Sequence, residues 1–327
     1  MSGLDRVRLR LDRVRAAVGE IGPAFLDTPA LPCAPLSRAL GCSVTLKVET
    51  LNPVRCFKGR GTETVAAAAR ENGASRVVCA SAGNLGQALA YSGRHRGLAV
   101  TVVAARTANP LKLSQIAAFG ADVRLVGEDI EDARLSAREI AEAVHAYLVE
   151  DSLDLATCEG AATIGLELVR DDPELDVVLV AVGGGAMASG VGYALRSLAE
   201  HVEVIGIQPL GAPAMALSWR QQRVVESDSI ETIADGVAGR CPIPEVLGDL
   251  LVVLDDVMLV REDSIKVGMR MLYEHAGLVI EPSAALGVAA VLENPDRFAG
   301  RRVTTVLCGS NVDPSDFARW VLEPVAR

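Results

Sequence analysis

Short, mostly apolar segments alternate with helical patterns along this chain, and this alternation constrains the fold more than any other sequence feature. The apolar segments have the length and valine content of buried strands, and they cover residues 43–49, 76–80, 99–104, 122–126, 177–182, 202–207 and 303–307. Helical patterns lie between them at residues 61–72, 84–96, 110–119, 130–146, 161–170 and 188–199. The alternation predicts an α/β fold whose parallel sheets are covered by helices on both faces. Because no eightfold repeat is visible, we expect two open twisted sheets rather than a closed barrel.

Length and composition place the chain among globular proteins and argue against a nucleic-acid partner. Its 327 residues suggest two domains or one large domain, and 50% hydrophobic with 23% charged residues is a globular composition. The 32 Lys and Arg residues are outnumbered by 42 Asp and Glu residues, which gives a net charge of −10. Nucleic-acid binding relies on a basic surplus and on aromatic stacking, but aromatic residues make up only 3% of this chain.

Hydropathy and cysteine usage indicate where the protein resides. The longest apolar runs, at residues 98–105 and 177–182, are far shorter than the ~20 residues that a transmembrane helix needs. The seven cysteines form no CxxC pair, and an odd number in a long chain does not suggest a disulfide framework. We therefore expect a cytoplasmic protein with no membrane partner.

Four segments at predicted strand ends carry unusual residues. In an open α/β sheet, ligands bind where strands end and helix N-termini offer free N–H groups. The four segments cover residues 48–61, 80–87, 182–190 and 307–313. In the third segment, the consecutive glycines Gly183, Gly184 and Gly185 allow the backbone to approach an anion closely. They predict a phosphate site, with a plain tight turn as the alternative.

The other three segments each have a functional and a structural interpretation. Lys58 begins a predicted helix, where the macrodipole disfavours a cation. A lysine in such a place suits a Schiff base with an aldehyde cofactor, although an exposed surface lysine is the alternative. Residues 81–84 suit a carboxylate or form an ordinary N-cap, and residues 308–311 are either part of a site or a turn.

The order and spacing of these segments resemble the serine/threonine dehydratase family of fold type II pyridoxal-phosphate enzymes. The SAGN segment follows Lys58 by 23 residues, the glycine run by 125 and CGSN by 250, and further similar stretches lie at residues 28–29, 109–112, 161–165, 233–236 and 280–283. The resemblance implies the tryptophan synthase beta-like architecture. It places a large cofactor-binding domain at residues 1–47 and 150–327, and a small inserted domain at residues 48–149.

The resemblance also implies roles for single residues, with pyridoxal 5'-phosphate as the cofactor. Lys58 would form the Schiff base with the cofactor and act as the catalytic base. Phe57 and Gly236 would lie on the two sides of the pyridine ring, and Cys308 at its nitrogen. The remaining cofactor contacts would come from Asn84, Gly183, Gly184, Gly185, Ala186 and Met187. Substrate binding is implied for Ser81, Ala82, Gly83 and Asn84.

The activity that the resemblance implies is a pyridoxal-phosphate-dependent β-elimination. The freed amine of Lys58 would remove the Cα proton of a small amino-acid substrate, and the β-hydroxyl would leave. Such an ammonia-lyase would convert L-threonine or L-serine to a 2-oxo acid and ammonia. A β-replacement enzyme and a non-catalytic amino-acid or cofactor-binding protein are the alternatives. The resemblance allows a homodimer, but no sequence feature fixes the oligomeric state.

Several residues depart from the family pattern. Ala82 stands where serine racemases have a second serine, so we expect no racemisation. Gln208 and Ala214 occupy positions of acidic metal ligands in relatives, and we predict no metal site. Arg55 replaces a small or neutral residue, and one hypothesis is that it binds the distal carboxylate of a substrate such as 3-hydroxyaspartate. An outward-pointing arginine is the alternative.

Overall fold

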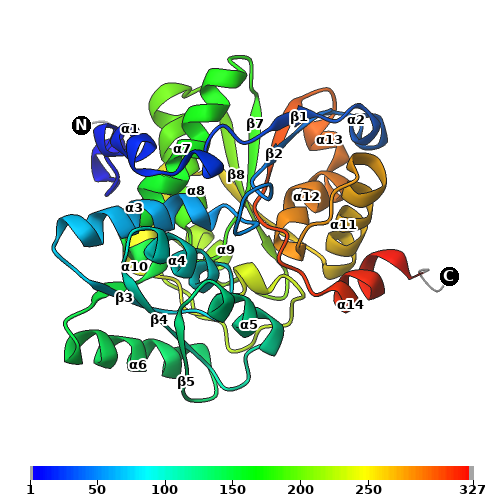
Figure 1. The fold of residues 1–327 in the computed structure, drawn as a ribbon. Helices are drawn as coiled ribbons and strands as arrows, with labels where there is room; N and C mark the ends of the chain where they lie inside the picture. Colours follow the sequence, from blue (N-terminus) through cyan, green and yellow to red (C-terminus); the bar gives the residue numbers. More distant parts are fainter. Residues whose placement is uncertain (1–2, 324–327) are drawn as a thin grey trace.

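The computed structural model describes residues 3–323, which form two β-sheets with helices packed against them (Figure 1). The larger sheet has the strand order β1-β2-β10-β7-β8-β9, with the bounds Ala30–Pro32, Ser43–Val48, Arg302–Leu307, Val177–Ala181, Glu203–Pro209 and Asp256–Val260. The smaller sheet has the order β5-β4-β3-β6, with the bounds Asp122–Leu125, Ala99–Ala104, Arg76–Ala80 and Tyr147–Val149. The predicted α/β architecture with two open sheets is confirmed.

The predicted strands agree with the structure except at the edges of the sheets. β3 and β4 have the predicted bounds, and the other predicted strands differ by one or two residues at their ends. β1, β6 and β9 lie outside the predicted strands. β1 and β6 have only three residues each, and β9 begins at the second of two adjacent aspartates. Parallel pairing is wrong for β1, which pairs antiparallel with β2, with Ala30 opposite Lys47. Antiparallel edge strands are common on parallel sheets. Proline is tolerated in an edge strand because the N–H group that it lacks would face solvent and not another strand.

Fourteen α-helices connect and cover these strands in the described part of the chain. The helices α1 to α7 have the bounds Leu11–Glu20, Ala34–Leu40, Lys58–Glu71, Asn84–His95, Pro110–Ala118, Ile130–Ala143 and Leu155–Asp171. The helices α8 to α14 have the bounds Ala186–Leu198, Ala214–Gln221, Pro244–Val253, Glu262–Ala276, Leu286–Glu293, Pro295–Phe298 and Pro314–Phe317. Three of them, α3, α4 and α8, begin within residues of the predicted site.

The smaller sheet is covered on both faces. Successive side chains of a strand point to opposite faces, and β3 accordingly contributes Val77 to one buried cluster and Val78 to another. Leu89 of α4 belongs to the first cluster, and Ala137 of α6 belongs to the second. The larger sheet is built around β7, every residue of which is buried. Both sheets thus show the two-sided burial that their apolar sequences predict.

Helix α3 links the two sheets, because it packs against both α4 and α7. Two glycines allow α3 and α7 to approach each other closely. A Cβ atom on Gly61 would lie 2.7 Å from the carbonyl oxygen of Thr157, and one on Gly160 would lie 2.6 Å from that of Arg60. Any larger side chain would push the helices apart and move Lys58, the first residue of α3.

A buried group of charged side chains lies beneath the first turn of α3; we call it the Arg60 cluster, and it consists of Arg60, Glu49, Glu167 and Lys47. Arg60 donates to both oxygens of Glu49 at 2.8 and 2.9 Å, and to both oxygens of Glu167 at 2.7 and 2.9 Å. The Lys47 amine is 2.5 Å from Glu167. Two cations and two carboxylates therefore balance each other, and they join α3, β2, α7 and the residue after β2.

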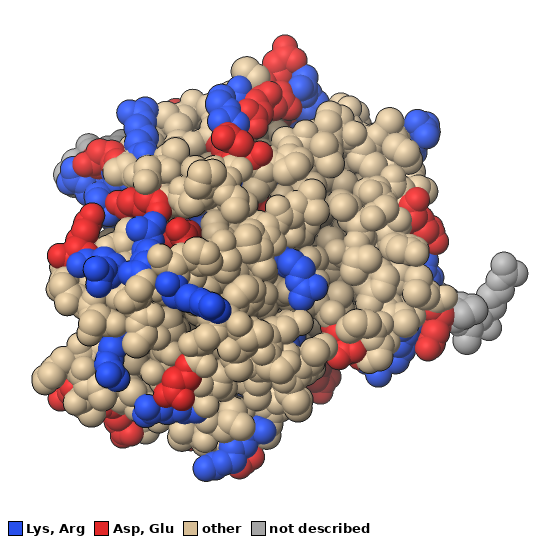
Figure 2. Space-filling model, in the orientation of Figure 1, with Lys and Arg blue, Asp and Glu red and all other residues tan. Residues whose placement is uncertain are grey.

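The strands of the smaller sheet lie within residues 76–149, and those of the larger sheet lie outside that range. The division of the chain at residues 47/48 and 149/150 stays a prediction. Within residues 3–323, no helix has the length and hydropathy to cross a membrane. Basic and acidic side chains are interspersed over the face of the molecule that Figure 2 shows.

Candidate active site

A cavity of about 990 Å³ lies where strands of both sheets end. Its wall includes Ala80 at the end of β3, Val149 at the end of β6, Ala181 at the end of β7, and Cys308 directly after β10. Ligand sites in open α/β sheets lie at such carboxyl ends, where the following helices present their N-termini. The cavity is therefore the place where the fold offers a binding site.

All but one of the predicted site residues line this cavity. They are Phe57, Lys58, Ser81, Ala82, Gly83, Asn84, Gly183, Gly184, Gly185, Ala186, Met187, Gly236 and Cys308. Residues that are up to 251 positions apart in the sequence thus face one cavity. The roles of the individual residues stay predictions.

Arg55 is the exception. Its side chain is exposed and does not contribute to the cavity wall. Its backbone has a φ of +54°, and its carbonyl oxygen accepts a hydrogen bond of 2.9 Å from the N–H of Ser310. Arg55 thus joins the loop before Lys58 to the segment after β10 through its backbone. The hypothesis that its side chain contacts substrate has no support from this placement.

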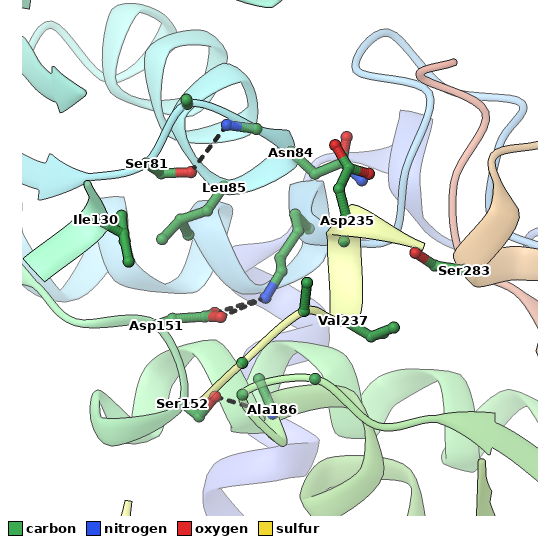
Figure 3. A pocket seen from close by; sticks show the side chains of 18 of the residues that line it. Ser81, Asn84, Leu85, Ile130, Asp151, Ser152, Ala186, Asp235, Val237 and Ser283 are labelled. Atoms are coloured by element: carbon green, nitrogen blue, oxygen red, sulfur yellow. Dashed lines mark hydrogen bonds and ion pairs between the residues drawn. The ribbon is translucent and has the colours of Figure 1, made fainter. Parts of the chain in front are cut away.

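Lys58 reaches the cavity from the first position of α3. The preceding loop is fixed because the Phe57 N–H donates to the carbonyl oxygen of Cys308 at 2.9 Å. The amine of Lys58 lies 2.6 and 2.8 Å from the two carboxylate oxygens of Asp151, which points at it from the end of β6 (Figure 3). This ion pair offsets the macrodipole, which by itself disfavours a cation at the start of a helix.

The glycine run joins β7 to α8. Gly185 has a φ of +107°, a left-handed conformation that favours glycine, and a Cβ atom on Gly184 would lie 2.7 Å from the hydroxyl of Ser152. Within residues 3–323, the N–H groups of the three glycines donate to no acceptor, while the N–H of Ala186 donates to Ser152 Oγ at 3.2 Å (Figure 3). Free N–H groups at the N-terminus of a helix suit a phosphate.

Asn84 begins α4 and is oriented by two other side chains. Its Nδ2 donates to the carboxyl oxygens of Glu281 at 2.9 and 3.1 Å, and its Oδ1 accepts from Nδ2 of Asn311 at 2.7 Å. The Asn311 N–H also donates to Glu281 at 3.2 Å. The amide plane of Asn84 is thereby fixed.

Burial changes the acidity of two groups beside this network. Burial raises the pKa of Glu281 from 4.5 to about 7, because the hydrogen bonds from Asn84 and Asn311 only partly offset the loss of water. Burial likewise raises the pKa of the Cys308 thiol well above its usual value, and the nearby Glu281 adds to this effect. Cys308 is therefore a neutral thiol near pH 7.

Sequence reasoning missed four residues around the cavity: Asp151, Ser152, Glu281 and Asn311. Asp151 and Ser152 follow β6 after one intervening residue, and the three residues of this strand carry no strand pattern of their own. Glu281 and Asn311 stand within stretches that carry the family resemblance, but neither has a local feature that predicts its hydrogen bonds to Asn84. Recognising β6 as a strand would have placed Asp151 at the edge where ligands bind.

The model of the family described as pyridoxal-phosphate dependent enzyme matches residues 21–309. The chain belongs to this family. The L-threonine ammonia-lyase of Thermotoga maritima is 36% identical to it over 284 residues, which cover 85% of this chain and 69% of that protein.

Solved structures of the pyridoxal-phosphate enzyme family agree with this assignment. The processed form of a threonine deaminase from Solanum lycopersicum has a TM-score of 0.87 and 26% identity, with 96% of this chain and 89% of that chain covered. Maize serine racemase has a TM-score of 0.89 and 26% identity, with 94% and 95% covered. The fold is therefore the fold type II architecture that the sequence predicts.

The residues of the cavity fit the family's cofactor, pyridoxal phosphate. The free N–H groups of the glycine run match its phosphate, and the amine of Lys58 matches its aldehyde. A Cβ atom on Gly236 would lie 2.7 Å from Ser283 Oγ, a buried cavity-lining hydroxyl with no partner within residues 3–323. The cavity thus has both space and unpaired polar atoms for a ring that carries polar substituents.

The residues that replace metal ligands of relatives have structural contacts here. Gln208 is buried at the end of β8, and its Oε1 accepts a hydrogen bond of 2.8 Å from the N–H of Ala216. Ala214 is the first residue of α9 and is also buried. In the described part of the chain, no group of three or more His, Cys, Asp or Glu side chains is arranged to hold a metal ion.

Proposed function

We propose that this pyridoxal-phosphate enzyme is an ammonia-lyase for a small β-hydroxy amino acid such as L-threonine or L-serine. The reaction would give a 2-oxo acid and ammonia. Relatives whose names state threonine ammonia-lyase or threonine deaminase activity support this proposal. When bound, the cofactor supplies an aldehyde for a Schiff base and a conjugated ring that takes up negative charge from Cα.

The observation that carries the proposal is the position of the Lys58 amine, which faces the cavity beside the free N–H groups of the glycine run. In the proposed site, Lys58 would bind the cofactor aldehyde and would then take the Cα proton. The glycine run and Ala186 hold the phosphate. Phe57 and Gly236 would lie on the two sides of the ring, Cys308 would lie at its nitrogen, and Asn84 would form a hydrogen bond with its phenolic oxygen.

The N-terminus of α4 is the proposed site of the substrate carboxylate. Ser81, Ala82 and Gly83 line the cavity directly before this twelve-residue helix, and Gly83 N–H donates to Ser81 Oγ at 3.2 Å. This bond supports a fixed loop, and a helix N-terminus favours an anion. A carboxylate bound there would place the Cα atom of a small amino acid within the same cavity as the Lys58 amine.

The remaining proposals concern the setting of the enzyme. We propose a small inserted domain at residues 48–149, a cytoplasmic location, serine among the accepted substrates, and a homodimer without nucleic-acid or membrane partners. None of the seven cysteines is paired in the structure, and only Cys241 is exposed, which fits a reducing compartment. Size-exclusion chromatography with light scattering tests the dimer.

Release of ammonia and 2-oxo acid from a panel of amino acids tests the proposed activity. The panel holds L-serine, L-threonine, D-serine, 3-hydroxyaspartate and O-acetylserine with a thiol acceptor. We expect turnover of L-threonine or L-serine, and a loss of at least about 10³-fold in Lys58→Ala. The visible absorbance band of the Schiff base should also disappear in that variant.

Lys112→Ala is the matched control, because this lysine also lines the cavity but pairs with Asp235. It should keep the visible band. Turnover of O-acetylserine with the thiol alone would indicate β-replacement instead. A parent protein that binds the cofactor but turns over nothing in the panel would overturn the proposal.

A further inference from the structure

Asp151 is the acidic side chain nearest to the proposed reacting amine, and its carboxylate has no other donor. Both of its oxygens lie within 2.8 Å of the Lys58 amine, and no other N–H or O–H group of residues 3–323 donates to either oxygen. The side chain is 33% exposed and contributes to the cavity wall. In Figure 3, dashed lines join the carboxylate of Asp151 to an amine nitrogen, which is that of Lys58.

The backbone holds Asp151 in this place independently of the ion pair. It starts a short 3-10 helix, Asp151–Leu153, which one residue separates from α7. The Thr157 hydroxyl donates to the carbonyl oxygen of Asp151, and the N–H groups of Leu153 and Asp154 donate to that of Glu150 at 2.9 and 3.0 Å. The backbone of Asp151 therefore stays at this point of the cavity whether or not Lys58 carries a proton, and the amine of Lys58 orients the carboxylate.

A carboxylate that a held backbone presents to an amine stabilises the protonated amine and directs its N–H bonds. Two of the three protons of a Lys58 ammonium would point at Asp151, because each of its oxygens is within hydrogen-bond distance. The third proton is then free to point into the cavity. This arrangement defines where an ammonium at Lys58 can deliver a proton.

We propose that Asp151 is a positioning residue that holds the Lys58 ammonium so that it protonates the departing β-hydroxyl. This inference rests on the proposed lyase function. The neutral amine takes the Cα proton, and the resulting ammonium gives one proton to the β-oxygen as the Cβ–O bond breaks. The electron pair of the Cα–H bond becomes the second Cα–Cβ bond, and the Cβ–O pair leaves with the oxygen as water. Lys58 is neutral again, and Asp151 remains a carboxylate throughout.

The proposed role of Asp151 predicts different effects on two substrates, whereas a purely structural role predicts the same effect on both. Hydroxide is a poor leaving group, so a β-hydroxyl needs a proton as it departs, whereas chloride leaves as a stable anion. Asp151 should therefore matter for L-serine and hardly at all for β-chloro-L-alanine. A distortion of the cavity would slow both substrates alike.

The test compares single-turnover rates of the cofactor-loaded parent and Asp151→Asn on these two substrates. Asparagine keeps the size of the side chain and one oxygen acceptor but removes the charge. We expect the ratio of the L-serine rate to the β-chloro-L-alanine rate to fall about 100-fold, which is within the range for loss of proton transfer. Glu150→Gln is the matched control, because Glu150 pairs with Arg138 and does not contact Lys58. Its ratio should equal that of the parent.

A titration with pyridoxal phosphate gives a readout besides activity. Asp151 Oδ2 would lie 3.4 Å from a Cβ atom on Gly184, so the carboxylate is close to the proposed phosphate site. Removing its charge should leave cofactor binding as tight as in the parent or tighter. If Asp151→Asn does not bind pyridoxal phosphate, Asp151→Ala is the second neutral variant, and we expect the same change in its rate ratio.

An unchanged rate ratio in a variant that binds the cofactor would overturn the role of Asp151, and so would an equal loss on both substrates. Either result would leave the proposed function standing, because the parent would still release ammonia from L-serine. A parent that is inactive on every hydroxyamino acid would overturn the lyase function and this inference together.

Discussion

The Arg60 cluster and the cavity both bury carboxyl groups, but the two regions provide them with different partners. Burial by itself would raise the pKa of Glu167, yet the hydrogen bonds and charges of Arg60 and Lys47 outweigh it and lower this pKa to about 2. Glu281 forms hydrogen bonds with amide N–H groups of Asn84 and Asn311 rather than with a cation, and its pKa rises to about 7. The charge of the partner, and not the depth of burial, decides which form of a buried acid is stable.

The two regions should therefore respond to pH in opposite directions. An unfolded glutamate loses its proton near pH 4.5, but folded Glu281 keeps it until about pH 7. The folded state binds more protons in this window, so its contribution to stability falls as pH rises from about 4.5 to 7. Folded Glu167 stays ionised down to about pH 2, so its contribution is present above pH 4.5 and falls as pH drops toward 2.

Removing the central cation of the Arg60 cluster should have the largest effect on stability. Arg60→Met leaves Glu49 and Glu167 buried with only Lys47 to neutralise them. We expect the free energy of unfolding of the cofactor-free protein at pH 7 to fall by about 3 to 5 kcal/mol. Urea denaturation followed by circular dichroism measures it. A loss below about 1 kcal/mol would contradict the view that this cluster depends on its own cations.

Replacing the buried acid of the cavity, Glu281, should have a smaller effect on the free energy of unfolding, and this effect should depend on pH. Glu281→Gln removes a carboxyl group whose pKa is raised from 4.5 to about 7, a difference that corresponds to about 3 kcal/mol. We expect the free energy of unfolding of the parent to fall by this amount, relative to that of the variant, as pH rises from 4.5 to 7. The measurement is urea denaturation of both cofactor-free proteins across this range. If the difference in free energy of unfolding between parent and variant were the same at every pH in this range, Glu281 would titrate like an exposed acid.

An exposed ion pair of the same chemistry completes the comparison. Arg138 lies 2.6 Å from Glu150 at the cavity, with side chains that are 57% and 31% exposed. Water and salt screen such a pair, so Arg138→Ala should change the free energy of unfolding by about 1 kcal/mol or less. Urea denaturation at low and high salt should show this small difference shrinking as salt is added. If Arg138→Ala lowered the free energy of unfolding as much as Arg60→Met does, burial could not be the reason why the Arg60 cluster contributes more to stability than an exposed ion pair.

Much of the candidate site was predictable from the sequence because its signals are local. Lys58, Asn84 and the glycine run each stand at a strand-to-helix junction, and the structure brings all of them to one cavity. The lysine at a helix start was recognisable as a misplaced charge without any knowledge of its partner. Short elements such as β6 were not predictable, since three residues carry too little pattern.

Residues whose importance depends on a distant partner could not be found in this way. Asp151 is 93 residues from Lys58, and Glu281 is 197 residues from Asn84. The outward direction of Arg55 likewise follows from its left-handed backbone and its bond to Ser310, which no neighbouring residue indicates. A sequence window reports backbone preference and periodicity, but it does not report which side chains meet.

By itself, the sequence determined the α/β class, the strand ends that carry the site, and the residues that match the pyridoxal-phosphate enzyme family. These features depend on hydrophobic periodicity and on glycine and lysine at junctions, which act over a few residues. Only the tertiary structure decided which carboxyl groups are neutralised, which acid faces Lys58, and that Arg55 lies outside the cavity. The physical reason is that electrostatic energy depends on distance and burial in three dimensions, and neither is a property of adjacent residues along a chain.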